Sequence, residues 1–207
     1  VLDELMGWSA GDFRMDAAWR MLSAGGLDAS TLGNHDFDRG APVLSAGAAE
    51  AAFPLLCANL DWPEAAPAAV AELKGLRVGL IGLITESDTR RASGVAPTDP
   101  AEALAALAPD IGAACDLLIL LSHCGRHVDL DLAPILAERA PCPAWIVGGH
   151  THHVLNRDGL EPRNLVAATP ILQAGCKSAF LGEAVWSRDG DPAAAGLDAA
   201  RLIALDD

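Results

Sequence analysis

The sequence contains no hydrophobic run long enough to cross a lipid bilayer. A transmembrane helix needs about 18 or more consecutive apolar residues. The longest run of large aliphatic residues here, 117–121, has only the length of a strand. We therefore expect no membrane partner for this chain.

Basic residues are scarce as well. The 207 residues include 14 Lys and Arg against 28 Asp and Glu, for a formal net charge of −14. Proteins that bind the nucleic-acid backbone present a basic face, so this balance argues against nucleic acid as a partner. It does not exclude a small phosphate substrate, because bound cations can supply local positive charge.

Paired cysteine motifs are also missing. The five cysteines include no C-x-x-C pair, and an odd number cannot all pair within one chain. Cys57 and Cys115 lie in apolar stretches, where we expect them to be small core residues. This usage leans towards a reducing compartment. No targeting segment is visible, and the sequence does not identify the localisation.

Strand-like and helix-like segments alternate along the chain, which predicts an α/β fold around a sheet. We expect one domain over residues 1–207, with 188–207 forming a terminal strand or the start of a linker. Strands are predicted at 29–32, 54–58, 76–84, 116–121, 144–147, 170–174, 180–186 and 201–204. Helices are predicted at 13–23, 41–52, 99–114 (kinked or split at Pro109) and 128–140, and a proline-rich loop at 61–68.

All six histidines lie in or just after the loops that follow three of these strands. The three loops contain GNHDFD (33–38), Ser122-His123 and GGHTHH (148–153). In open α/β sheets, ligands gather beyond the carboxyl ends of the strands. Imidazole, amide and carboxylate groups together suit Zn, Mn, Fe or related divalent ions. The pattern therefore predicts a metal site, and Gly33 and Gly149 are expected to let the backbone turn sharply there.

These motifs resemble those of the 5'-nucleotidase branch of the calcineurin-like metallophosphoesterases. GNHDFD is similar to the GNH(D/E)FD motif of that branch, residues 149–152 to its GHTH motif, and Ser122-His123 to its intervening single-histidine motif. The resemblance runs over residues 27–181. It implies a metallophosphoesterase-type α/β/β/α sandwich, incomplete at its N-terminus. It also implies two divalent metal ions, with Mn, Zn, Fe and Co all chemically suitable.

The resemblance also implies a set of metal ligands. Asn34, His123 and His150 would hold one ion, and His152 would belong to the other. Two ions about 3.5–4 Å apart can bind a phosphate, activate a bridging water and stabilise an in-line displacement.

By the same resemblance, His35 would be the catalytic group that stabilises charge on the phosphoryl oxygens or protonates the leaving group. Asp38 would be the carboxylate that orients it. The family motifs do not require His127 or His153, and Cys124 is expected to have a packing role.

Two motifs of the family are not matched. Asp-x-His occurs nowhere in the chain, and Gly11-Asp12 is the only nearby Gly-Asp before Gly33. We interpret Asp12 as a loop or helix N-cap residue. We expect both missing motifs upstream of Val1. The alternative is a degenerate half-site. In either case this chain should bind one metal much better than two and be a weak catalyst.

The leading hypothesis for function is a phosphomonoesterase that acts on nucleotides, with a metal-bound hydroxide as the attacking group. An alternative keeps the site but changes the ester, to a 2',3'-cyclic phosphodiester or a sulfur-containing substrate. A third hypothesis is a degenerate, non-catalytic metal-binding module. The nucleotide preference rests on resemblance alone, and the oligomeric state is not predicted.

Overall fold

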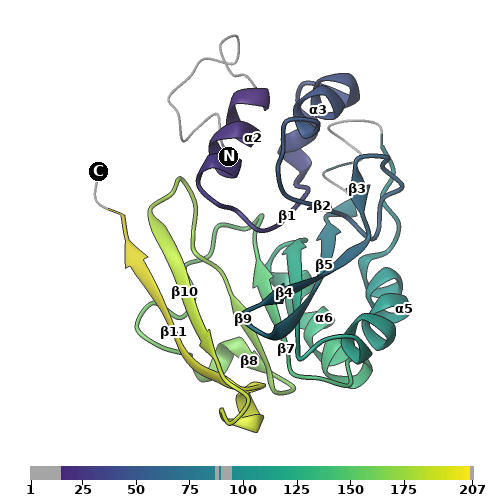
Figure 1. Cartoon of the computed structure of the whole chain (residues 1–207). Coiled ribbons are helices and arrows are strands. Elements are labelled where there is room, and N and C mark those ends of the chain that lie inside the picture. The colour runs from purple at the N-terminus through teal and green to yellow at the C-terminus, as the bar shows by residue number, and fades with distance from the viewer. Residues whose placement is uncertain (1–14, 87–88, 90–94, 206–207) are drawn as a thin grey trace.

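The computed structural model describes residues 15–86, 89 and 95–205. Gly11 and Asp12, considered above as a possible metal-binding motif, lie outside these residues, as does the predicted start of the first helix at Phe13. Figure 1 shows the described chain as a central sheet with helices against it, which confirms the α/β class. No helix among these residues is long and apolar enough to span a membrane.

The central sheet has six strands in the order β4-β5-β6-β7-β9-β8. Four neighbours in the middle, β5, β6, β7 and β9, run parallel, while β4 and β8 join the two edges antiparallel. Their bounds are β4 Ala68–Leu73, β5 Leu76–Ile84, β6 Leu117–His123, β7 Ala144–Gly148, β8 Leu165–Val166 and β9 Thr169–Leu172. The three long apolar strands expected from the sequence therefore lie side by side.

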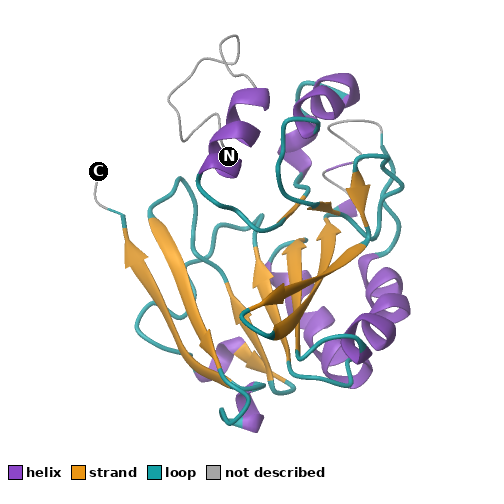
Figure 2. Ribbon diagram, in the orientation of Figure 1, coloured by secondary structure: helices purple, strands orange, loops and turns teal. Residues whose placement is uncertain are grey.

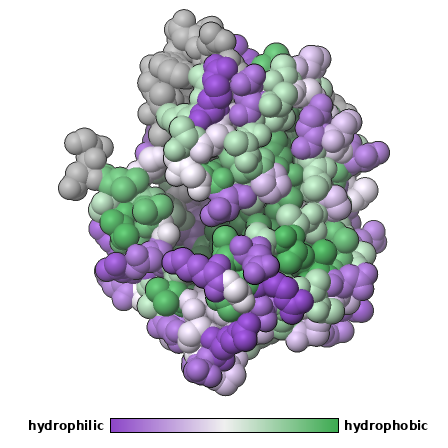
Figure 3. All heavy atoms as spheres, viewed as in Figure 1, coloured by the Kyte–Doolittle hydropathy of each residue, from purple (hydrophilic) through white to green (hydrophobic). Residues whose placement is uncertain are grey.

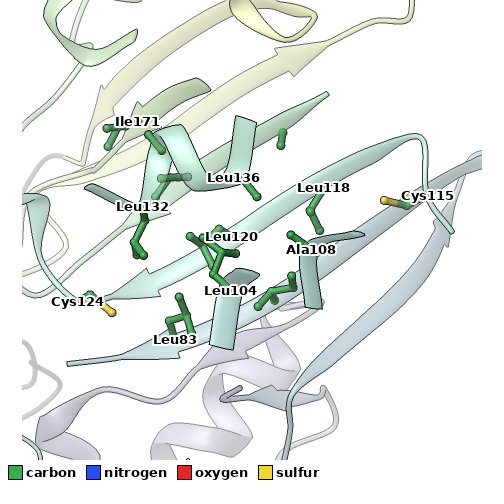
Figure 4. Close-up of a cluster of buried hydrophobic side chains, with 14 of the residues drawn as sticks. Leu83, Leu104, Ala108, Cys115, Leu118, Leu120, Cys124, Leu132, Leu136 and Ile171 are labelled. Atoms are coloured by element: carbon green, nitrogen blue, oxygen red, sulfur yellow. The ribbon is translucent and has the colours of Figure 1, made fainter. Parts of the chain in front are cut away.

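Helices α5 (Pro100–Ala113) and α6 (Arg126–Arg139) pack on the central sheet. Figure 4 shows the apolar core beneath them, with Leu104 of α5 and Leu132 of α6 against Leu120 of β6. Of the kink or split expected at Pro109, the split was wrong, since α5 is a single helix through that residue. Proline removes one backbone hydrogen bond, and burial of the Leu104 face offsets that loss.

A smaller parallel sheet lies above the central one and is formed by β1 (Ser30–Thr31), β2 (Leu55–Leu56) and β3 (Ala65–Ala66). Helices α2 (Met15–Ala24) and α3 (Ala41–Ala48) belong to this part, where Trp19 and Leu44 share a buried cluster. The loop predicted at 61–68 was wrong in part, because β3 lies within it and β4 begins at its end. Short edge strands tolerate flanking prolines.

The two sheets meet at Gly82 of β5. The amide of Ala58 donates to the Gly82 carbonyl at 2.7 Å. A Cβ atom on Gly82 would lie 2.5 Å from the backbone of Leu56. Only glycine allows this approach, which brings the loop after β1 close to the end of β6.

The chain ends in an antiparallel hairpin of β10 (Phe180–Trp186) and β11 (Leu197–Ala204), drawn as two long arrows in Figure 2. Trp145 of β7 is buried against this hairpin with Leu197, as expected for a core tryptophan. Leu181 and Ile203 pair across the hairpin and are exposed. Figure 3 shows apolar surface next to the C-terminal end of the chain. Short 3-10 helices occur at Asn34–Phe37, Pro162–Asn164 and Pro192–Ala194.

Candidate functional site

Three of the predicted ligands come together where β1, β6 and β7 end. Asn34 opens the 3-10 helix η1 (Asn34–Phe37), His123 is the last residue of β6, and His150 follows β7 by two residues. Because β6 and β7 are adjacent and parallel, with Ser122 opposite Gly148, their carboxyl ends present both histidines at one edge of the sheet. The contact between the two sheets brings Asn34 to the same place.

The side-chain oxygen of Asn34 is the point on which the three residues converge. Asn34 Oδ1 lies 3.0 Å from His123 Nε2 and 3.2 Å from His150 Nδ1. The two imidazole rings have centroids 5.3 Å apart. Atoms that bind one ion at about 2.0–2.2 Å lie roughly 3.0–3.5 Å from one another. The amide oxygen and two ring nitrogens therefore fit a shared divalent ion.

This donor set is two imidazoles and an amide. Within the described part of the chain, no group of three His, Cys, Asp or Glu side chains could hold a metal ion, so the amide of Asn34 is needed as a donor. The trio would supply three donor atoms, and further donors would have to complete the coordination of an ion.

The electrostatics of His123 favour the form that binds metals. Burial, followed by the imidazoles of His150, His35 and His152, lowers the pKa of His123 to about 4. The ring is therefore neutral at pH 7, with a lone pair available on one nitrogen.

The loop after β7 has an unusual backbone. Both of its predicted ligands are in the left-handed region, with φ 68° at His150 and 58° at His152. Thr151 Oγ1 accepts the Arg126 amide at 3.0 Å and lies 2.9 Å from His153 Nδ1. Left-handed residues other than glycine are costly and persist when their surroundings hold them. His150 is thus held in contact with Asn34, whereas His152 is exposed.

His35 follows Asn34 in η1, is exposed and pairs with Asp38. His35 Nδ1 is 2.9 Å from Asp38 Oδ2, and their side chains are 56% and 44% exposed. The turn that carries them is closed by the Asp36 carboxylate, which accepts the Gly33 amide at 2.7 Å. This contact has the geometry expected for a carboxylate that orients an imidazole, and the catalytic role of the pair stays a prediction.

Gly33 and Gly149 were expected to allow sharp backbone turns, but the structure gives a different reason for them. Gly33 has an extended backbone with φ −116°, and Gly149 is not among the residues of positive φ, so neither is needed for a sharp turn. A Cβ atom on Gly33 would lie 2.9 Å from His123 Cε1, and one on Gly149 would lie 3.2 Å from His123 Nδ1. Both glycines instead leave room for the His123 ring.

Sequence reasoning missed a buried polar pair beneath the site. The Ser122 hydroxyl donates to Asp129 Oδ1, and the other carboxylate oxygen has no hydrogen-bond partner in the described structure. Burial raises the pKa of Asp129 to about 7, against the effects of Ser122 and Arg126. The signal was present in α6, where Asp129 lies three residues before buried Leu132 on the same face.

Comparisons with known proteins agree with this geometry, although no family model matches the sequence. The chain is 31% identical over 161 residues to a probable 5'-nucleotidase of Treponema pallidum, an alignment that covers 72% of this chain and 26% of the relative. Across the first three curated relatives, the chain spans about a third or less of the relative's length.

Two solved structures have the same fold. A 5'-nucleotidase precursor from Thermus thermophilus superposes with a TM-score of 0.71 at 29% identity, covering 94% of this chain and 42% of that protein. The calcineurin-like phosphoesterase YfkN of Bacillus subtilis gives 0.69 at 19% identity, covering 97% of this chain and 68% of that one. By sequence and fold, the chain belongs to the 5'-nucleotidase branch of the calcineurin-like metallophosphoesterase superfamily.

Proposed function

We propose that residues 1–207 form one metallophosphoesterase domain that hydrolyses phosphate esters with divalent metal ions, and that its substrates are nucleoside monophosphates. The observation that carries the proposal is that ring nitrogens of His123 and His150 both lie close to the side-chain oxygen of Asn34. The nucleotide substrate is supported by the names of the relatives, among them 5'-nucleotidases of Treponema pallidum and Diplobatis ommata.

Asn34, His123 and His150 would hold one ion, and His152 would contribute to a second. When bound, the ions would neutralise phosphate charge and activate a water molecule for attack on phosphorus. Asn34 and His123 would hold the first ion from fixed positions, since Asn34 is 7% exposed and the His123 ring is confined between Gly33 and Gly149.

His35 would act on the substrate itself. Its ring is exposed and follows Asn34 directly in the chain, so it would be available to the phosphoryl oxygens or the leaving oxygen of an ester held by the trio. Asp38, with Oδ2 2.9 Å from Nδ1, would orient the ring and leave Nε2 available to the substrate. A proton held at Nε2 could then pass to the leaving group.

The test combines metal content with activity. The chain is loaded with Mn²⁺ or Co²⁺, dialysed and analysed for bound metal, and then assayed with adenosine 5'-monophosphate and with 2',3'-cyclic AMP. We expect about one tightly held ion per chain and weak hydrolysis that favours the monophosphate. Preference for the cyclic ester would instead support the alternative substrate.

A His123→Ala variant distinguishes metal binding at the proposed site from adventitious metal binding elsewhere on the chain. It should lose the bound ion and the hydrolysis together, whereas the matched His127→Ala variant should keep both. If His123→Ala bound metal as well as the parent chain, the proposed site would be wrong. Metal binding without hydrolysis of any ester would instead support the non-catalytic module.

A further inference from the structure

Two cysteines lie in contact at the end of the sheet opposite the candidate site. The Sγ atoms of Cys115 and Cys142 are 3.7 Å apart, and both thiols are free. Cys115 precedes β6 and Cys142 precedes β7, so the pair marks the amino ends of the two strands whose carboxyl ends carry His123 and His150.

Both cysteines are held by well-ordered hydrogen bonding around them. Cys115 follows α5, and its amide donates to the Gly112 carbonyl at 3.4 Å. Next to Cys142, the Pro143 carbonyl accepts the Leu118 amide at 2.9 Å, which ties the start of β7 to β6. The sulfur of Cys115 also fills the space left by Gly79 of β5, where a Cβ would lie 2.8 Å from it.

We propose that Cys115 and Cys142 are a modification site, at which a small-molecule disulfide oxidises the pair to an intramolecular disulfide. The bond needs the sulfur atoms to approach to about 2.05 Å. The sulfurs are already in van der Waals contact, so small side-chain rotations at two neighbouring chain segments can supply this movement.

The different exposure of the two thiols sets the order of the reaction. Cys142 is half-buried and lines a cavity of about 300 Å³ together with Arg188, whereas Cys115 is 6% exposed. A disulfide reagent therefore reaches Cys142 first. Arg188 in the same cavity is ion-paired with Asp116, with 3.1 Å between Nη2 and Oδ1, so charge does not select the reagent, and oxidised glutathione serves as a general small-molecule disulfide.

The chemistry is two successive thiol–disulfide exchanges. The Cys142 thiolate attacks one sulfur of oxidised glutathione, which forms a mixed disulfide and releases one glutathione thiolate that takes up a proton. The Cys115 thiolate then attacks the Cys142 sulfur and releases the second glutathione. The two cysteines lose two hydrogens and two electrons in all, and the oxidant is reduced to two glutathione molecules.

The environment makes this exchange slow at neutral pH. Burial and the adjacent Cys115 raise the pKa of Cys142 to about 12, so little thiolate is present at pH 7. The rate of cross-linking should therefore rise with pH up to at least pH 9, because the thiolate is the attacking species.

The cross-link would stabilise the domain without reaching the site. It joins two residues 27 positions apart and closes a loop that contains β6 and α6. Closing a loop of this size restricts the unfolded chain and raises the melting temperature, by several degrees for a domain of this size. Metal binding by the Asn34 trio at the other end of β6 should not change.

The experiment uses the whole chain, reduced and then incubated with oxidised glutathione at pH 8.5. Remaining thiols are alkylated and the protein is analysed by intact mass and by peptide mapping. We expect a product two hydrogens lighter that carries three alkyl groups, a linked peptide joining Cys115 to Cys142, and a higher melting temperature that reductant reverses. A Cys176→Ala control should form the same link.

A Cys142→Ala variant should show no link and no rise in melting temperature. A stable glutathione adduct on Cys142, or alkylation of both thiols after prolonged oxidation, would overturn the proposal. A link between any other two cysteines would overturn it as well. None of these outcomes bears on the metal site, so the result is independent of the proposed hydrolase function.

Discussion

Asn34 Oδ1 lies 3.0 Å from His123 Nε2, although 89 residues separate them in the chain. The contact joins the short sheet to the central sheet at the place where both end. His150 Nδ1 completes the group at 3.2 Å from the same oxygen. Three segments that are remote in sequence thus bring nitrogen and oxygen donors to one point, as a metal ligand set does.

An Asn34→Ala substitution should lower the affinity for Mn²⁺ or Co²⁺ at least 10-fold, because it removes the atom on which the two imidazoles converge. The affinity is measured by isothermal titration. The free energy of unfolding without metal should change by less than the free energy of metal binding, since Asn34 lies at the end of a loop. Unchanged affinity would mean that the trio is not a ligand set.

Gly33→Ala should damage the site through the ring of His123 and not through the backbone. The new Cβ would lie 2.9–3.1 Å from three ring atoms, so the ring must move. We expect a loss of about 1–3 kcal/mol in the free energy of unfolding and weaker metal binding. Gly25→Ala is the matched control, because its Cβ would lie 3.4 Å from the Leu22 carbonyl. Equal effects of the two variants in urea unfolding would contradict this explanation.

His35→Ala should separate turnover from metal binding. If His35 acts on the substrate, the variant keeps its metal content while hydrolysis falls roughly 10²–10⁴-fold. Asp38→Asn should cause a smaller fall, because it weakens only the orientation of the ring. Steady-state rates with adenosine 5'-monophosphate and metal analysis of the same samples check both points. Loss of metal from His35→Ala would show that this residue is a ligand instead.

Asp129 should make stability depend on pH. Its pKa in the folded protein is about 7, above the ordinary value of 3.8. Between about pH 4 and pH 7 the Asp129 carboxyl is deprotonated in the unfolded chain but still protonated in the folded protein. The contribution of Asp129 to the free energy of unfolding is therefore full below about pH 4 and is lost as the pH rises to about 7.

Asp129→Asn should therefore gain stability relative to the parent chain as the pH rises from 4 to 8, on the order of 2–4 kcal/mol. The amide can still accept the Ser122 hydroxyl proton. Urea unfolding at several pH values in the presence of a chelator gives the difference between the two proteins. A difference that does not vary with pH would show that the Asp129 carboxyl is not perturbed.

Asp99 should stabilise α5 as its N-cap. Its carboxylate accepts the Ala101 amide at 2.7 Å and the Glu102 amide at 3.3 Å. Asp99→Ala should cost about 0.5–2 kcal/mol of unfolding free energy. Asp110→Ala, at an exposed position later in the same helix, should cost less. Equal losses for the two variants would argue against capping.

Much of the secondary structure could be predicted because it depends on local patterns. Residues 76–84 and 180–186 are the strands that their apolar and β-branched content predicted. Asp99 and Pro100 mark the start of α5 in the usual way. The errors lie where packing overrides a local signal, as at Pro109 within α5 and at the short strand β3 within a proline-rich segment.

The sequence by itself determined which residues are chemically able to bind a metal and that they follow strands, since both depend on residue type and short spacing. Only the tertiary structure decided that ring nitrogens of His123 and His150 meet at the side-chain oxygen of Asn34, while His152 is exposed. It also decided that Gly33 is needed for space and that Cys115 touches Cys142. These relationships depend on the register between β6 and β7 and on the approach of two sheets at Gly82, which no local pattern encodes.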